Sequence, residues 1–138
     1  MAEQPTIVVV DYHKGNLSSV ARGLMRAGAD ARISDAPADI AAADALVIPG
    51  VGSFYDAVEF MAQTGQAAAV LEAAEAGKAF LGICLGLQLL FDRGDEGVSE
   101  DAPVAAAADA YGTGLPVGTV FEAEGRRWVR GLGLLQGS

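Results

Sequence analysis

One cysteine stands between two glycines, in the pentapeptide Gly82-Ile83-Cys84-Leu85-Gly86. An apolar run typical of a strand precedes it at 79–81, and an apolar run typical of a helix follows at 87–91. Small residues on both sides of a nucleophile, at a turn from strand to helix, are the pattern of a nucleophile elbow, where a neighbouring Cβ would clash. The pattern therefore requires a strand that ends at the cysteine and a helix that begins there.

A lone cysteine can also be a small buried hydrophobe. The two glycines, with a strand before them and a helix after them, favour a nucleophile instead. The N-terminus of the following helix would point at the sulfur and stabilise the thiolate relative to the thiol. Cys84 is therefore the candidate catalytic residue.

Strand and helix patterns alternate from residue 6 to residue 91. Strands are expected at 6–10, 29–34, 45–48 and 79–83, and helices at 17–25, 38–43, 55–61, 66–76 and 85–91. Asn16 is the expected N-cap of the first helix, and Gly28 is expected to end it. Alternation of this kind predicts an α/β fold with a doubly wound, mostly parallel sheet.

Three loops would meet at the carboxyl edge of this sheet: the elbow, the loop at 11–16 and the glycine-rich turn at 50–52. A turn like 50–52 alone is usually only structural. Beside a cysteine elbow, its backbone amides could stabilise a tetrahedral oxyanion, which needs two donors. The amide of Leu85 would supply one donor and an amide of Gly50, Val51 or Gly52 the other.

The pattern weakens after residue 91. The segment at about 92–118 carries six acidic residues and one basic residue, together with two prolines, and we expect a mobile, solvated loop. Residues 119–123 and 127–130 could pair as a hairpin around Glu124-Gly125-Arg126. We expect all 138 residues to form a single domain.

Composition excludes several function classes. With 18 acidic and 9 basic residues the net charge is −9, which disfavours binding to nucleic acid or to anionic membranes. The single cysteine excludes an internal disulfide framework and, with no leader-like N-terminus, predicts a cytoplasmic protein. We expect no metal site and no cofactor, because neither a ligand cluster nor a nucleotide-binding fingerprint is present.

The sequence resembles the class I glutamine amidotransferases, and within that class most resembles the glutaminase subunit of imidazole glycerol phosphate synthase, from histidine biosynthesis. The resemblance runs in order along the whole chain. It is carried by the segments Asp11–Val20, Pro49–Phe54, Gly82–Phe91 and Gly131–Gly133. It implies a flavodoxin-like sheet, hydrolysis of glutamine, and a cyclase subunit that forms a heterodimer with this chain and receives the ammonia.

The resemblance also implies residue roles. Cys84 would attack the glutamine amide and form a thioester, while Gln88, Gly50 and Gly52 would bind the substrate. Val51 and Leu85 would form the oxyanion hole, and residues 12–16 would lie near the partner subunit. From the residues alone, Gln88 would be an ordinary position on a helix surface.

One departure from the family pattern is severe. The family completes its catalytic triad with a histidine and a glutamate farther along, whereas the only histidine here is His13, in the loop expected to face the partner. A solvated or interface histidine is the alternative to a replacement base there. We therefore expect a C-terminally truncated form with an incomplete sheet and little or no activity.

Other readings remain open. The chain could belong to another class I amidotransferase, of the anthranilate or pyridoxal phosphate synthase type, although residues 11–20 argue against that. It could be a non-catalytic module that docks on a synthase. It could also be a free thiol hydrolase or a redox sensor that acts through Cys84 without a partner.

Overall fold

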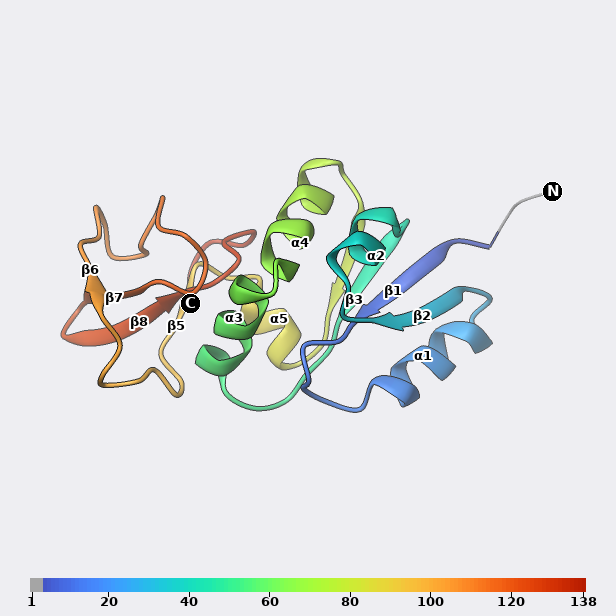
Figure 1. Ribbon diagram of the computed structural model, residues 1–138, viewed down its shortest axis with the longest axis horizontal. Coiled ribbons are helices and arrows are strands. Elements are labelled where there is room, and N and C mark those ends of the chain that lie inside the picture. Colours follow the sequence, from blue (N-terminus) through green and yellow to red (C-terminus); the bar gives the residue numbers. More distant parts are fainter. Residues whose placement is uncertain (1–3) are drawn as a thin grey trace.

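A computed structural model describes residues 4–138 as a parallel sheet with helices on both faces and a smaller second sheet beside it (Figure 1). The main sheet has the strand order β2-β1-β3-β4, with all pairs parallel. Its strands and helices are β1 (Thr6–Val10), α1 (Leu17–Arg26), β2 (Asp30–Ser34), α2 (Pro37–Ala42), β3 (Ala45–Ile48), α3 (Phe54–Gln63), α4 (Gln66–Glu75), β4 (Ala79–Gly82) and α5 (Leu85–Leu89).

Alternate residues of the central strands face different helices, which makes the sheet doubly wound as predicted. Val9 and Val47 pack against α1 through residues such as Leu24. Val8 and Ile48 belong to the larger core on the other face, to which α2, α3, α4 and α5 all contribute. Within the described part of the chain, no helix is long and apolar enough to cross a membrane.

Local signals fix the helix ends close to where the sequence predicts them. The Asn16 side chain caps α1 by accepting a bond from the Ser19 amide at 3.3 Å, and Gly28 follows that helix with a φ of +98°. Ser53 caps α3 through the Asp56 amide at 3.4 Å. The elbow helix α5 ends at Leu89, two residues earlier than expected.

The second sheet has the order β5-β8-β7-β6 and forms the end of the molecule away from α1 (Figure 1). Its strands are β5 (Arg93–Gly94), β6 (Val104–Ala105), β7 (Val120–Ala123) and β8 (Arg126–Arg130). The predicted hairpin is confirmed as β7 and β8, joined by a two-residue turn in which Glu124 and Gly125 both have positive φ.

The segment at 92–118 contains more structure than a solvated loop. It supplies β5 and β6, and two of its charged residues are buried: Asp92 pairs with Arg130 at 2.9 Å, while Arg93 stacks on Trp128. Sequence composition could not reveal these partners, because both lie more than thirty positions further along the chain. Mobility of the remaining loop stays a prediction.

Candidate active site

Cys84 lies at a strained turn between β4 and α5, with φ +55° and ψ −118°, and its side chain is exposed. The two flanking glycines are needed there. A Cβ on Gly86 would lie 1.6 Å from the carbonyl oxygen of Ile48, and one on Gly82 would lie 2.7 Å from the Cα of Leu87. A residue other than glycine at positive φ is strained, and such strain often marks a functional site when the surrounding structure holds the backbone in that conformation. Here the strand, the helix and both close approaches enforce it.

The turn at 49–52 lies directly beside the elbow. Two backbone bonds join them: Ile83 N–H donates to Ile48 O at 3.0 Å, and Leu85 N–H donates to Gly50 O at 3.1 Å. Gly50 and Gly52 have φ of +151° and +116°, which favour glycine. The structure thus brings together four of the predicted residues, Gly50, Gly52, Cys84 and Leu85. In this conformation, however, the Leu85 amide is already bonded.

Tyr12 is buried beneath this turn and was not predicted to belong to the site. Its hydroxyl donates to the carbonyl of Pro49, and a Cβ on Gly50 would clash with the same hydroxyl. Burial raises the pKa of the Tyr12 phenol, and the charge of Cys84 raises that pKa further. The Tyr12 side chain therefore points into the fold, while the expectation that residues 12–16 lie near a partner subunit stays a prediction. The only relevant signal in the sequence was that Tyr12 follows a buried strand. That signal does not say whether its side chain points into the core or toward solvent.

We expect Tyr12→Phe to lower the free energy of unfolding by about 1–2 kcal/mol, because it leaves the buried Pro49 carbonyl unpaired. The raised pKa also sets a pH dependence. Above about pH 10 the unfolded chain releases the Tyr12 proton while the folded chain retains it, so wild-type stability falls. Urea unfolding between pH 7 and pH 11 measures both effects. An equal decline in Tyr12→Phe would contradict the assignment.

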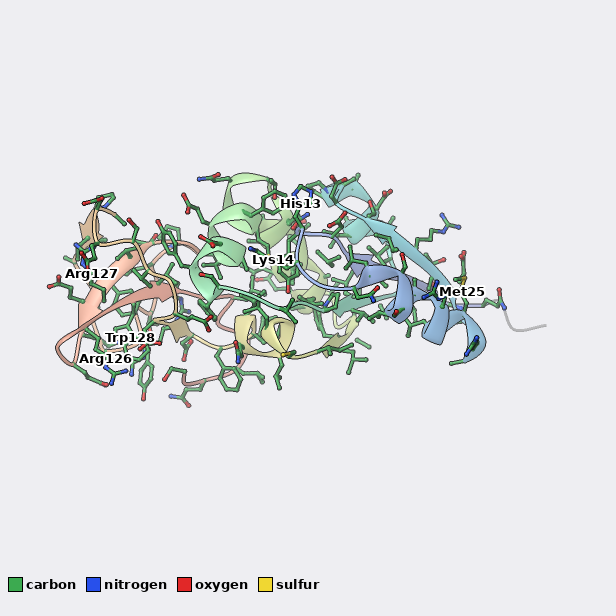
Figure 2. All side chains as sticks on the ribbon, turned by 90° about the horizontal axis from the view of Figure 1, so that it is seen from below. His13, Lys14, Met25, Arg126, Arg127 and Trp128 are labelled. Carbon is green, nitrogen blue, oxygen red and sulfur yellow. The ribbon has the colours of Figure 1, made fainter. Side chains whose placement is uncertain are left out.

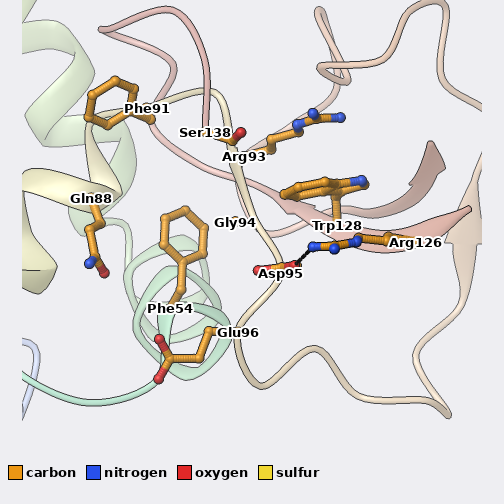
Figure 3. A pocket seen from close by; sticks show the side chains of 10 residues that line it. All are labelled: Phe54, Gln88, Phe91, Arg93, Gly94, Asp95, Glu96, Arg126, Trp128 and Ser138. Atoms are coloured by element: carbon orange, nitrogen blue, oxygen red, sulfur yellow. Dashed lines mark hydrogen bonds and ion pairs between the residues drawn. The ribbon is translucent and has the colours of Figure 1, made fainter. Parts of the chain in front are cut away.

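Gln88 lies one turn beyond Cys84 and lines a cavity of about 360 Å³ between α5 and the second sheet (Figure 3). The cavity wall also includes Phe54, Glu96 and Trp128. The Glu96 carbonyl accepts bonds from the Tyr55 amide at 3.1 Å and the Ser53 hydroxyl at 3.3 Å, which fixes this loop at the start of α3. Glu96 was predicted only as one acid of a solvated loop, because its neighbours come from distant parts of the chain.

The loop between β1 and α1 contacts the same turn from outside. The positions of Lys14 and Gly15 are close to Gly52 and Gly50: a Cβ on Gly52 would lie 3.4 Å from the Lys14 Cδ, and one on Gly15 would lie 3.0 Å from the Gly50 Cα. Figure 2 shows His13 and Lys14 on this loop, far from Arg126 and Trp128 at one end of the molecule.

The ring of His13 packs against Phe60 of α3, with centroids 4.6 Å apart. This contact gives the chain's only histidine a structural partner on the helix. Residues 4–138 contain no group of three or more His, Cys, Asp or Glu residues positioned to hold a metal ion.

Comparison with known proteins identifies relatives of this chain. The family model for class I glutamine amidotransferases matches residues 8–117. The imidazole glycerol phosphate synthase subunit HisH of Symbiobacterium thermophilum is 53% identical over 91 residues, which are 66% of this chain and 43% of the relative. HisH of Synechococcus elongatus (strain ATCC 33912 / PCC 7942 / FACHB-805) is 48% identical over 99 residues, 72% of this chain and 46% of the relative. The chain thus spans less than half the length of these relatives.

Solved structures support the fold. A glutamine amidotransferase aligns with a TM-score of 0.54 and 22% identity, over 62% of this chain and 45% of that chain. A putative peptidase E from Listeria monocytogenes EGD-e aligns with a TM-score of 0.56 and 16% identity, over 64% and 50%. At these identities the likeness concerns the fold alone, and it agrees with the α/β architecture described above.

Proposed function

Because the chain belongs to the class I glutamine amidotransferase family, we propose that it carries the nucleophile of a glutaminase that supplies ammonia to a cyclase subunit in histidine biosynthesis. The observation that supports this most strongly is the exposed Cys84, held at positive φ between a strand and a helix. We also propose a cytoplasmic location, which suits a free thiol. Glutamine is the substrate that both the family and the relatives' activity suggest.

The proposed reaction has two steps. The Cys84 thiolate attacks the side-chain carbonyl carbon of glutamine, the C–N bond breaks, and ammonia leaves after its nitrogen accepts a proton. Water then attacks the γ-glutamyl thioester, which releases glutamate and returns the thiol. The resemblance assigns the proton transfers to a histidine–glutamate pair, and His13 packs on Phe60 instead.

The oxyanion hole would form by rotation of one peptide unit. The carbonyl of Gly50 and the amide of Val51 belong to the same planar peptide, and that carbonyl now accepts the Leu85 N–H at 3.1 Å. Turning this peptide over would release the Leu85 amide and direct the Val51 amide toward the other face. Both expected donors would become available in a single motion.

A partner subunit could drive that rotation through the loop at 13–16. His13, Gly15 and Asn16 are exposed, and this loop lies against Gly50 and Gly52. A cyclase bound there would touch a loop that lies against the segment that must rotate. We therefore propose residues 13–16 as part of the heterodimer interface, with glutamine hydrolysis dependent on docking.

The test is glutamate production by this protein with and without a cyclase subunit of imidazole glycerol phosphate synthase. We expect glutamate and ammonia in equal amounts and at a low rate that the cyclase stimulates, in keeping with the little activity that the sequence predicts for this chain. A γ-glutamyl adduct on Cys84, captured by acid quench and mass spectrometry, would identify the nucleophile. Cyclase binding without any glutamate above background would instead support a second candidate, a non-catalytic docking module. The packing of His13 against Phe60 favours that candidate, because it gives this histidine a structural contact instead of a catalytic one.

A further inference from the structure

The loop between β1 and α1 restrains Gly50 at two points. Tyr12 contacts it with its hydroxyl: a Cβ on Gly50 would lie 1.9 Å from that oxygen, so only glycine leaves room for the phenol. Gly15, from the same loop, also approaches closely, since a Cβ on Gly15 would lie 3.0 Å from the Gly50 Cα. The position of Gly50 therefore depends on the conformation of this loop.

The Tyr12 hydroxyl also fixes the peptide that precedes Gly50. It donates to the Pro49 carbonyl, which belongs to the planar unit that joins Pro49 to Gly50. Tyr12 is only 1% exposed, so water does not compete for this bond. Burial, together with the charge of Cys84, raises the pKa of the phenol, and the hydroxyl therefore stays protonated and remains a donor.

This anchor limits the rotation that would release the Leu85 amide. The rotating unit joins Gly50 to Val51, and it turns about the line between their Cα atoms through ψ of Gly50 and φ of Val51. Because Tyr12 ties the preceding peptide, the torsions before Gly50 cannot share the movement. Val51, at the other end of the unit, is 60% exposed, so the buried restraint acts from the Tyr12 side.

We infer that Tyr12 is a positioning residue that holds the Gly50–Val51 peptide in the state in which its carbonyl accepts the Leu85 N–H. The inference rests on the proposed function for its consequence, because the same rotation would form the oxyanion hole. Tyr12 shares its loop with the exposed residues proposed above as part of the interface. A subunit that docks on the exposed part of this loop would thus act on the turn through the buried part.

Hydrogen exchange of two backbone amides, measured by NMR on the whole protein without a partner, tests this. The Leu85 amide is bonded to the Gly50 carbonyl at 3.1 Å and exchanges when the peptide rotates. The Ile83 amide is bonded to the Ile48 carbonyl at 3.0 Å, outside the rotating peptide, and reports the general stability. Tyr12→Phe should raise the exchange rate of the Leu85 amide about tenfold, the effect of one buried hydrogen bond.

Ile40→Val is the control for a general loss of stability. Ile40 is fully buried on α2, outside the loop and the turn, and removing one buried methylene lowers stability by an amount similar to the loss of a hydrogen bond. The Ile83 amide should therefore respond alike in the two variants, whereas the Leu85 rate in Ile40→Val should stay within about twofold of wild type. An unchanged Leu85 rate in Tyr12→Phe, or a rise that Ile40→Val reproduces, would overturn the inference.

The exchange measurement uses no glutamine, so its result is separate from the proposed function. In the glutaminase assay, Tyr12→Phe should raise glutamate release without the cyclase and thereby reduce the stimulation that the cyclase produces. Tyr55→Phe, which removes a phenol hydroxyl from the groove between α3 and β6, should leave that stimulation unchanged. A wild-type protein that forms no glutamate with or without the cyclase would overturn the proposed function and leave the restraint by Tyr12 intact.

Discussion

Replacing Cys84 by alanine is expected to lower the small glutaminase activity expected of this chain to the background rate, as loss of a catalytic nucleophile does in other enzymes. The reason is that no covalent intermediate can form, whereas all binding contacts remain. Glutamate release in the presence of the cyclase subunit measures the effect. Glutamate release by Cys84→Ala at the wild-type rate would show that Cys84 is not the nucleophile.

Cyclase affinity provides the control for this variant. The Cys84 side chain is exposed at the elbow, and its removal leaves the loop at 13–16 untouched. The dissociation constant for the cyclase should therefore stay within about twofold, a change of less than 0.5 kcal/mol. A protein that loses both affinity and activity would indicate damage to the fold and would not inform on chemistry.

Gly86→Ala is expected to destabilise the fold by about 3 kcal/mol or more, the upper end of the effects of overpacking. The added Cβ would meet backbone atoms of Ile48, at 1.6 Å from the oxygen and 2.4 Å from the carbonyl carbon. Neither atom can move away without distorting β3, which pairs with β1 and β4. Thermal or urea unfolding measures the loss.

Gly23→Ala is the matched control, and it should raise the free energy of unfolding where Gly86→Ala lowers it. Gly23 lies inside α1, and a Cβ there meets nothing within 4 Å. Alanine should therefore stabilise the protein by about 0.5–1 kcal/mol through helix propensity. Equal stability of the two variants would contradict the close packing of the elbow on β3.

Sequence predicted the parts of this protein whose signals are local. The elbow, the parallel strands and the caps at Asn16 and Gly28 depend on neighbouring residues and on simple periodicity. Features created by distant contacts were missed. The inward position of Tyr12 depends on Pro49, and burial of Arg93 depends on Trp128. The cavity could not be predicted either, because its walls come from α3, α5 and β8.

The hydrogen bond from the Leu85 amide to the Gly50 carbonyl affects how much glutamine the protein would hydrolyse without its partner. We call the peptide closed when the Gly50 carbonyl accepts this bond and open when the peptide has rotated. One backbone hydrogen bond contributes only about 1 kcal/mol net, which would favour the closed state over the open state by about fivefold. If that bond alone held the peptide closed, an undocked protein would hydrolyse glutamine at a sizeable fraction of its full rate and release ammonia to solvent. Tight control of this leak therefore requires a second restraint, and the buried Tyr12 hydroxyl, which is bonded to the carbonyl of the adjoining Pro49–Gly50 peptide, is positioned to supply one.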